Sequence, residues 1–170
     1  DEGVSQEGGY MLYSLVMAED SWTVIVDRDG DYVFYAQGDE HTMIPTSKVG
    51  LDGKSILYTS NDSAQTDDVS TITRIALDGS TESVTEITTG HHDFAELPDG
   101  GFGYLGMDFQ VHDVDGEEWE IAGDTIIEIE EGETRNDDSN EVFNAFDEYS
   151  EPWRPCSHFD NGAYGYESMA

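Results

Sequence analysis

Basic residues are almost missing from this chain of 170 residues. Only 6 lysines and arginines stand against 39 aspartates and glutamates, which gives a formal net charge of -33 at pH 7. A surface this acidic repels phosphate groups, so binding of nucleic acid by phosphate neutralisation is excluded. Docking on an anionic membrane is excluded for the same reason.

Cysteine and long apolar runs are also scarce. Cys156 is the single cysteine, so no disulfide can form within the chain. It is either a buried thiol or the partner of a cysteine in another chain. The longest nearly apolar stretch, residues 10–18, is far shorter than a membrane-spanning helix requires. We therefore expect no insertion into a membrane.

The density of acidic residues predicts a strongly solvated surface. Salt would screen the self-repulsion of such a surface, which favours a halophilic or marine source. An ordinary acidic secreted protein explains the composition equally well. Disorder is the other reading of extreme charge, but aromatic residues make up 11% of the chain and lie in alternating runs. Segments 1–9 and 134–140 lack such a pattern, and we predict a flexible N-terminal segment over 1–9.

Turn signals punctuate the whole sequence, and alternating apolar residues flank them. Asp-Gly is a strong hairpin signal because glycine accepts a positive φ and aspartate tolerates it. No segment of helical length carries a sustained 3.6-residue apolar stripe. The pattern predicts an all-β fold with strands near 22–26, 32–35, 55–59, 71–77, 83–88, 94–97, 102–107, 125–129 and 141–146, and with Asp-Gly turns at 29–30, 52–53, 78–79, 99–100 and 115–116.

The spacing of these turns predicts a repeat. Asp29 and Asp78 are 49 residues apart, and Asp52 and Asp99 are 47 apart. Two hairpins in each period make a four-stranded antiparallel unit, the size of a β-propeller blade. We predict a partial propeller domain over 10–170, with about two and a half blades at 22–60, 70–108 and 124–170. Closed propellers have four to eight blades, so we expect further blades or a second chain to complete the ring.

An acidic motif at residues 27–31, Asp-Arg-Asp-Gly-Asp, resembles the start of a calcium loop. An EF-hand requires glycine at its sixth position and glutamate at its twelfth, where this chain has Tyr32 and Gly38. A hairpin turn is the better interpretation. Weak Ca²⁺ binding stays open on so acidic a surface, but we assign no metal ligands and expect no cofactor.

Histidines are the candidates for chemistry, and the chain has five: His41, His91, His92, His112 and His158. His91 and His92 open a predicted hairpin, at a point where the inner strands of a propeller approach the central channel. Because adjacent strand residues point to opposite faces, we expect only one of the two rings to face a given side. A neutral imidazole can act as base, nucleophile or ligand. The other interpretation, which the residues alone favour, is a hydrogen-bonded structural histidine.

Residues 91–108, from His-His-Asp-Phe through Leu-Pro-Asp-Gly to Met-Asp, resemble a signature of the arylsulfotransferase family. Segments 123–129 and 142–147 are similar to the stretches that follow it, and 22–31 looks like the opening blade. The resemblance implies a six-bladed propeller, of which this chain looks like the N-terminal half. It also implies an exported enzyme, extracellular or periplasmic, that transfers a sulfuryl group from an aryl sulfate to a phenol through a sulfohistidine intermediate.

The resemblance carries only some site residues over. His92 best matches the channel histidine of the family's second blade, so we predict a sulfate-binding role for His92 and, as second choice, His91. No catalytic nucleophile is assigned, because the family's His-x-Asn motif is missing and the surroundings of His158 do not match it. Arg74 and Arg154 are the basic residues to test. The alternative function is a non-catalytic propeller or repeat module for extracellular binding or surface assembly.

Overall fold

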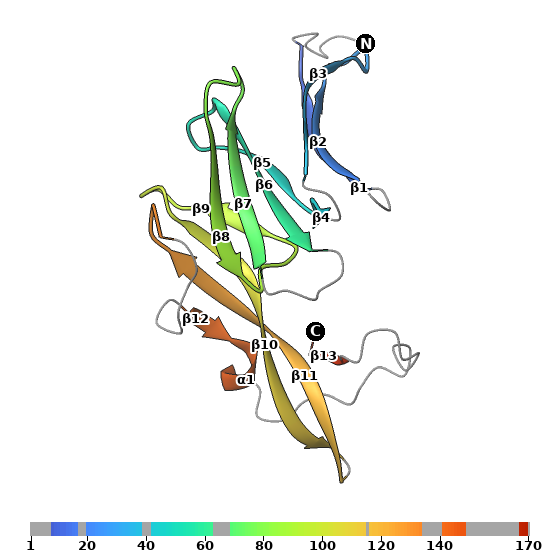
Figure 1. Cartoon of the computed structure of the whole chain (residues 1–170), viewed down its shortest axis with the longest axis vertical. Coiled ribbons are helices and arrows are strands. Elements are labelled where there is room, and N and C mark those ends of the chain that lie inside the picture. The colour runs from blue at the N-terminus through green and yellow to red at the C-terminus, as the bar shows by residue number, and fades with distance from the viewer. Residues whose placement is uncertain are drawn as a thin grey trace, which may run out of the picture. The chain divides into compact units, whose positions relative to one another are not determined.

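The structure, a computed structural model, describes residues 8–16, 20–38, 42–62, 69–114, 116–133, 141–148 and 167–169. The chain divides into two compact units, residues 1–86 and residues 87–170. Within the described residues both units consist of strands, and one short helix lies in the second unit (Figure 1). The predicted all-β class is confirmed.

The first unit holds two sheets. One has three antiparallel strands in the order β1-β2-β3, and the other has the order β4-β6-β7-β8 with β5 also paired to β6. The last strand, β8, ends two residues beyond the boundary between the units. The strands are β1 (Met11–Val16), β2 (Ser21–Val26), β3 (Tyr32–Gln37), β4 (Thr42–Met43), β5 (Ser47–Val49), β6 (Ser55–Asp62), β7 (Val69–Ala76) and β8 (Glu82–Thr88).

The second unit is built around a long hairpin. Two strands of 13 residues each, β10 (Phe102–Val114) and β11 (Glu117–Ile129), pair along their full length. The sheet order is β12-β11-β10-β9, and β13 pairs with β11 in parallel. The remaining elements are β9 (Phe94–Glu96), β12 (Glu141–Asn144), α1 (Ala145–Glu148) and β13 (Glu167–Met169).

The predicted turns lie where the sequence signals place them. The Asp-Gly pairs at 29–30, 52–53, 78–79 and 99–100 each join two consecutive strands, and the glycines have positive φ, from 64° at Gly53 to 94° at Gly100. In the first of these turns, the Asp27 carboxylate accepts hydrogen bonds from the backbone N–H groups of Asp29 (2.9 Å) and Asp31 (3.0 Å). Residues 27–31 therefore form the hairpin turn that the sequence favours.

The hairpins combine into sheets that start at different strands from the predicted blades. The strands of the three sheets lie within residues 11–37, 42–88 and 94–144, and the third sheet also includes β13 at 167–169. Equal spacing of similar turns fixes the length of a repeat but not its starting point, because every hairpin carries the same signal. The blade ranges 22–60, 70–108 and 124–170, and the number of blades, stay predictions.

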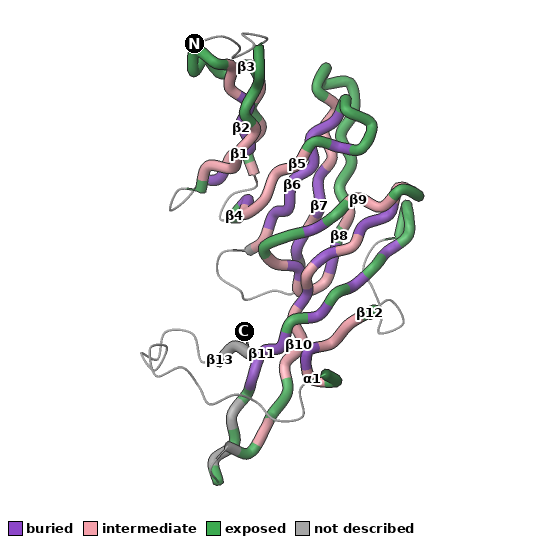
Figure 2. The backbone as a smooth tube through the Cα atoms, turned by 180° about the vertical axis from the view of Figure 1, so that it is seen from behind, coloured by how far each residue is buried: buried purple, intermediate pink, exposed green. Residues whose placement is uncertain are grey.

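Several predicted strand ends are wrong; the strand predicted over 125–129, for example, begins at Glu117. The strand predicted over 141–146 stops at Asn144, whose side-chain oxygen accepts a hydrogen bond from the Phe146 N–H at 2.9 Å and so caps helix α1; this is the usual role of asparagine at a helix start. The strand predicted to end at Met107 continues to Val114. Its polar residues alternate with apolar ones and lie on a more exposed part of the hairpin, towards the β10–β11 turn (Figure 2).

Burial is deepest on the central strands. All six residues of β6 from Ser55 to Ser60 are buried, and since successive side chains point to opposite faces, both faces of this strand are covered. In the second unit the rings of Phe94 and Phe102 pack edge to face at 6.3 Å, beside the buried Ile127 and Ile129. This core supports the start of β10 and the end of β11, where the candidate site lies.

Several predictions concern positions outside the described residues. These are most of the flexible segment predicted over 1–9, segment 134–140, His41, Arg154, Cys156 and His158.

Candidate functional site

The His91-His92 pair lies in the short connection between β8 and β9, in the second unit. The backbone of this connection is bonded to β10. His91 N–H donates to the Leu105 carbonyl at 2.9 Å, and Leu105 N–H donates to the Asp93 carbonyl at 3.1 Å. These two bonds fix the connection against the first part of β10.

A tight turn brings the two imidazole rings together. His92 has φ 53°, in the left-handed region, and the Asp93 N–H donates to the His91 carbonyl at 2.7 Å. The ring centroids of His91 and His92 are 5.0 Å apart, and the rings are nearly perpendicular. The expectation that the rings face opposite sides is therefore wrong. Alternation applies to extended backbone, and the left-handed residue breaks it.

His91 makes polar contacts with both of its ring nitrogens. Its Nε2 lies 3.2 Å from the carbonyl oxygen of Gly106 and 3.5 Å from a carboxylate oxygen of Asp124. Its Nδ1 lies 2.7 Å from Nδ1 of His92. The arrangement is a line of polar groups that runs from Asp124 on β11, through His91, to His92.

Close packing at Gly106 lets this line form. A methyl group at this position would meet Ile127 Cδ1 at 2.7 Å and Thr125 Oγ1 at 2.8 Å, so only glycine fits without displacing side chains. The neighbouring Met107 N–H donates to the Thr89 hydroxyl at 3.2 Å, a further hydrogen bond between β10 and the connection. The Gly106 carbonyl is thus held at a fixed place before His91.

The two histidines differ in exposure. The His91 side chain is 14% exposed, and burial lowers its pKa from 6.5, against the opposing effect of the Asp124 carboxylate and the Gly106 carbonyl. Burial disfavours the charged form of an imidazole, so His91 is neutral at pH 7. His92 is exposed. A neutral, anchored imidazole next to an exposed one can bind, accept or relay a proton.

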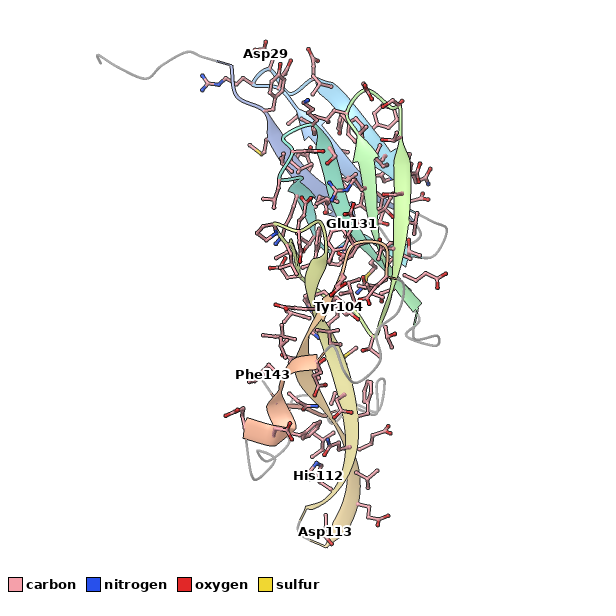
Figure 3. The ribbon with its side chains drawn as sticks, turned by 90° about the vertical axis from the view of Figure 1, so that its left-hand side faces the viewer. Asp29, Tyr104, His112, Asp113, Glu131 and Phe143 are labelled. Atoms are coloured by element: carbon pink, nitrogen blue, oxygen red, sulfur yellow. The ribbon has the colours of Figure 1, made fainter. Side chains whose placement is uncertain are left out.

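The other residues singled out from the sequence have different surroundings. Arg74, on β7 of the first unit, donates to the Ser55 hydroxyl at 3.1 Å and lies 4.0 Å from Asp52, so it supports the turn between β5 and β6. His112, near the turn of the long hairpin (Figure 3), stacks on Phe146 with ring centroids 5.2 Å apart. These contacts do not join Arg74 or His112 to the line of polar groups formed by Asp124, His91 and His92.

Asp124 and Gly106 received no role from the sequence. The signal that could have found them is the Asp-Gly turn at 115–116. Pairing the strands on its two sides symmetrically places Gly106 opposite Thr125 and Met107 opposite Asp124, as the structure shows, but the predicted blades separated these strands. The acidic composition hid Asp124, because one carboxylate among 39 acidic residues has no distinguishing mark.

A pocket in the second unit has a different character. It is lined mainly by carboxylates, which disfavour an anion such as sulfate. The lining residues are Leu97, Asp99, Glu128, Ile129, Glu130, Glu133 and Val142.

In the part of the chain that the structure describes, no three His, Cys, Asp or Glu side chains are grouped so as to hold a metal ion. Nor do the described residues form a helix with the length and apolarity to cross a membrane.

Comparison with known protein families gives a match over most of the chain. The family model Arylsulfotransferase (ASST) matches residues 3–165, almost the whole chain. No curated protein and no solved structure matches. The match confirms the family that residues 91–108 resemble, and together with the antiparallel sheets it confirms the β-propeller fold class.

Proposed function

Because the chain belongs to the arylsulfotransferase family, we propose that it takes part in transfer of a sulfuryl group from an aryl sulfate to a phenol, through a histidine intermediate. The observation that carries this proposal is the pair His91-His92, anchored to Gly106 and Asp124. It stands within the segment whose residues resemble the family most.

The proposed chemistry suits imidazole. A neutral ring nitrogen attacks sulfur, the sulfur–oxygen bond to the aryl group breaks, and the phenolate leaves with the electron pair of that bond. A second phenol then takes the sulfuryl group from nitrogen by the reverse step. The histidine that carries the intermediate is not assigned within this chain. His92 is proposed to bind the sulfate group, and His91, which contacts it, is the second choice for this role.

The setting of this reaction is also proposed. We place the protein outside the cytoplasm, extracellular or periplasmic, as the resemblance implies, and we expect further blades or a second chain to complete the propeller. The acidic surface is consistent with a salt-rich medium, in which its self-repulsion is screened.

A non-catalytic binding module is the second candidate. Strand β3 exposes Tyr32, Val33 and Tyr35, with 63%, 51% and 66% of each residue accessible. Exposed apolar side chains that gather on one strand are typical of a surface that meets a partner. This candidate needs no chemistry at the histidines.

An assay of transfer separates the two candidates. The complete protein is mixed with p-nitrophenyl sulfate and a second phenol, and p-nitrophenolate and the new aryl sulfate are both measured. We expect transfer by the wild type, a large loss in His92→Ala, and little change in His112→Ala, a matched histidine whose ring stacks on Phe146. Absence of transfer by the wild type, or equal rates in wild type and His92→Ala, would reject the enzyme.

A further inference from the structure

The short contact between the two histidines defines where their protons are. Nδ1 of His91 and Nδ1 of His92 are 2.7 Å apart, so one nitrogen donates a hydrogen and the other accepts it. A neutral imidazole carries one hydrogen, on one of its two nitrogens. The direction of this bond therefore decides which nitrogen of His92 keeps its lone pair.

The surroundings of His91 decide the direction. Its Nε2 faces the Gly106 carbonyl at 3.2 Å and the Asp124 carboxylate at 3.5 Å. Both groups only accept hydrogen bonds, so Nε2 carries the hydrogen. Since burial keeps His91 neutral, its Nδ1 is an acceptor. His92 must then donate from Nδ1, which leaves its Nε2 as the nitrogen at which a proton can be taken up.

The backbone holds the two rings in the positions that this direction of hydrogen bonding requires. The left-handed φ of His92 and the bonds from His91 and Leu105 hold the two rings in contact. The acceptors for His91 come from β10 and β11, which pair through their full length. One of the two acceptors, the Gly106 carbonyl, is therefore a backbone group that the strand pairing holds in place.

From this geometry we infer that Asp124 and His91 are positioning residues that fix the tautomer of His92, and that His92 Nε2 accepts the proton of the phenol during sulfuryl transfer. This inference rests on the proposed function. The phenol O–H bond breaks, an N–H bond forms at His92 Nε2, and the phenolate oxygen keeps the electron pair with which it attacks sulfur. In the reverse direction the imidazolium returns the proton to a departing phenolate.

The same direction of hydrogen bonding limits how His92 can bind sulfate. A neutral His92 spends its one hydrogen on His91, so it has none to donate to a sulfate oxygen. It becomes a donor from Nε2 only after it has taken up a proton. The resulting positive charge is compensated through His91 by the Asp124 carboxylate, which contacts His91 Nε2, much as a carboxylate supports the histidine of a catalytic triad.

The test is the nitrogen NMR spectrum of the ¹⁵N-histidine-labelled chain at pH 7.5, which distinguishes N–H from bare ring nitrogens. We expect Nε2–H for His91 and Nδ1–H for His92, each assigned by the loss of its signals in His91→Gln or His92→Gln. In His91→Gln and Asp124→Asn the His92 signals should move towards the Nε2–H form. Asp108→Asn is the matched control, because Asp108 binds Gln110 and Asn144 instead.

Activity of the complete protein supplies the second readout. For Asp124→Asn we expect kcat to fall about 10- to 100-fold with KM little changed, since loss of proton transfer affects the chemical step. Finding Nε2–H on His92 in the wild type, or a spectrum that Asp124→Asn leaves unchanged, would overturn the inference even if transfer is observed. The expected tautomers without any transfer would overturn the proposed function and the proton acceptor, and would leave the two positioning contacts as structural.

Discussion

Replacing Gly106 with alanine should destabilise the second unit, whereas the same replacement at Gly103, on the same strand, should not. A methyl group at Gly106 would lie 2.7 Å from Ile127 Cδ1 and 2.8 Å from Thr125 Oγ1, and both residues are buried. At Gly103 the nearest atoms, from Glu128 and Leu97, are 3.9 Å away, which is ordinary contact. The two positions thus differ in the room that they leave for a methyl group.

The magnitude follows from two opposing effects. Forcing a methyl group into a packed site costs about 1–3 kcal/mol. Replacing glycine by alanine also removes freedom from the unfolded chain, which stabilises by about 0.4–1 kcal/mol where the backbone permits. Gly106→Ala should therefore lose about 1–2 kcal/mol and Gly103→Ala should gain up to about 1 kcal/mol, a difference of about 2 kcal/mol.

Urea unfolding followed by circular dichroism measures this difference, with the midpoint compared at an unchanged slope. The nitrogen NMR spectrum of Gly106→Ala adds a second readout, because the carbonyl of residue 106 is the group that faces His91 Nε2. If Gly106→Ala proves as stable as Gly103→Ala, the packing around the site is not as described, and the fixed position of the Gly106 carbonyl can no longer be argued.

Three further predictions concern charge and core. The pKa of His91 is lowered from 6.5, chiefly by burial, so the unfolded chain binds more protons and stability should fall as the pH drops below about 6.5. His91→Gln should weaken this pH dependence in urea midpoints measured between about pH 7.5 and 5. Parallel curves for the wild type and His91→Gln would contradict it. Ile129→Ala removes a side chain that is 2% exposed and should cost about 2–5 kcal/mol, while Ile126→Ala, at 39% exposure on the same strand, should cost clearly less in the same assay. Raising NaCl from about 0.1 to 1 M shortens the screening length from about 10 to 3 Å and should raise the melting temperature, because the net charge is -33; an unchanged melting temperature would show that self-repulsion is unimportant.

Turn chemistry made the fold readable from the sequence. A positive φ at Gly30 or Gly100 requires glycine, and a preceding aspartate bonds the turn backbone, so each hairpin leaves a local signal. Strand pairing between hairpins leaves none. The signal at Asp78-Gly79 is the same whether the following strand closes one sheet or opens the next, and for this reason the sheets begin at other strands than the predicted blades.

The candidate site was predictable in identity but not in geometry. His91 and His92 stand out because histidines are few in this chain and because their segment resembles a family signature. Their mutual contact depends on the left-handed backbone of His92, which non-glycine residues rarely adopt and which nothing local announces. The role of Asp124 depends on register across a 13-residue hairpin, and its carboxylate is one of many.

Transfer of ³⁵S-labelled sulfate from an aryl sulfate to a second phenol, by the complete protein and by His92→Gln, tests the central claim most directly. We predict labelled aryl sulfate of the second phenol with the wild type, and a loss of at least about 100-fold with His92→Gln, the lower range for removal of a proton-transfer group. Label that appears solely in inorganic sulfate, or equal transfer by both proteins, would contradict the assignment of sulfuryl transfer to the His91-His92 pair.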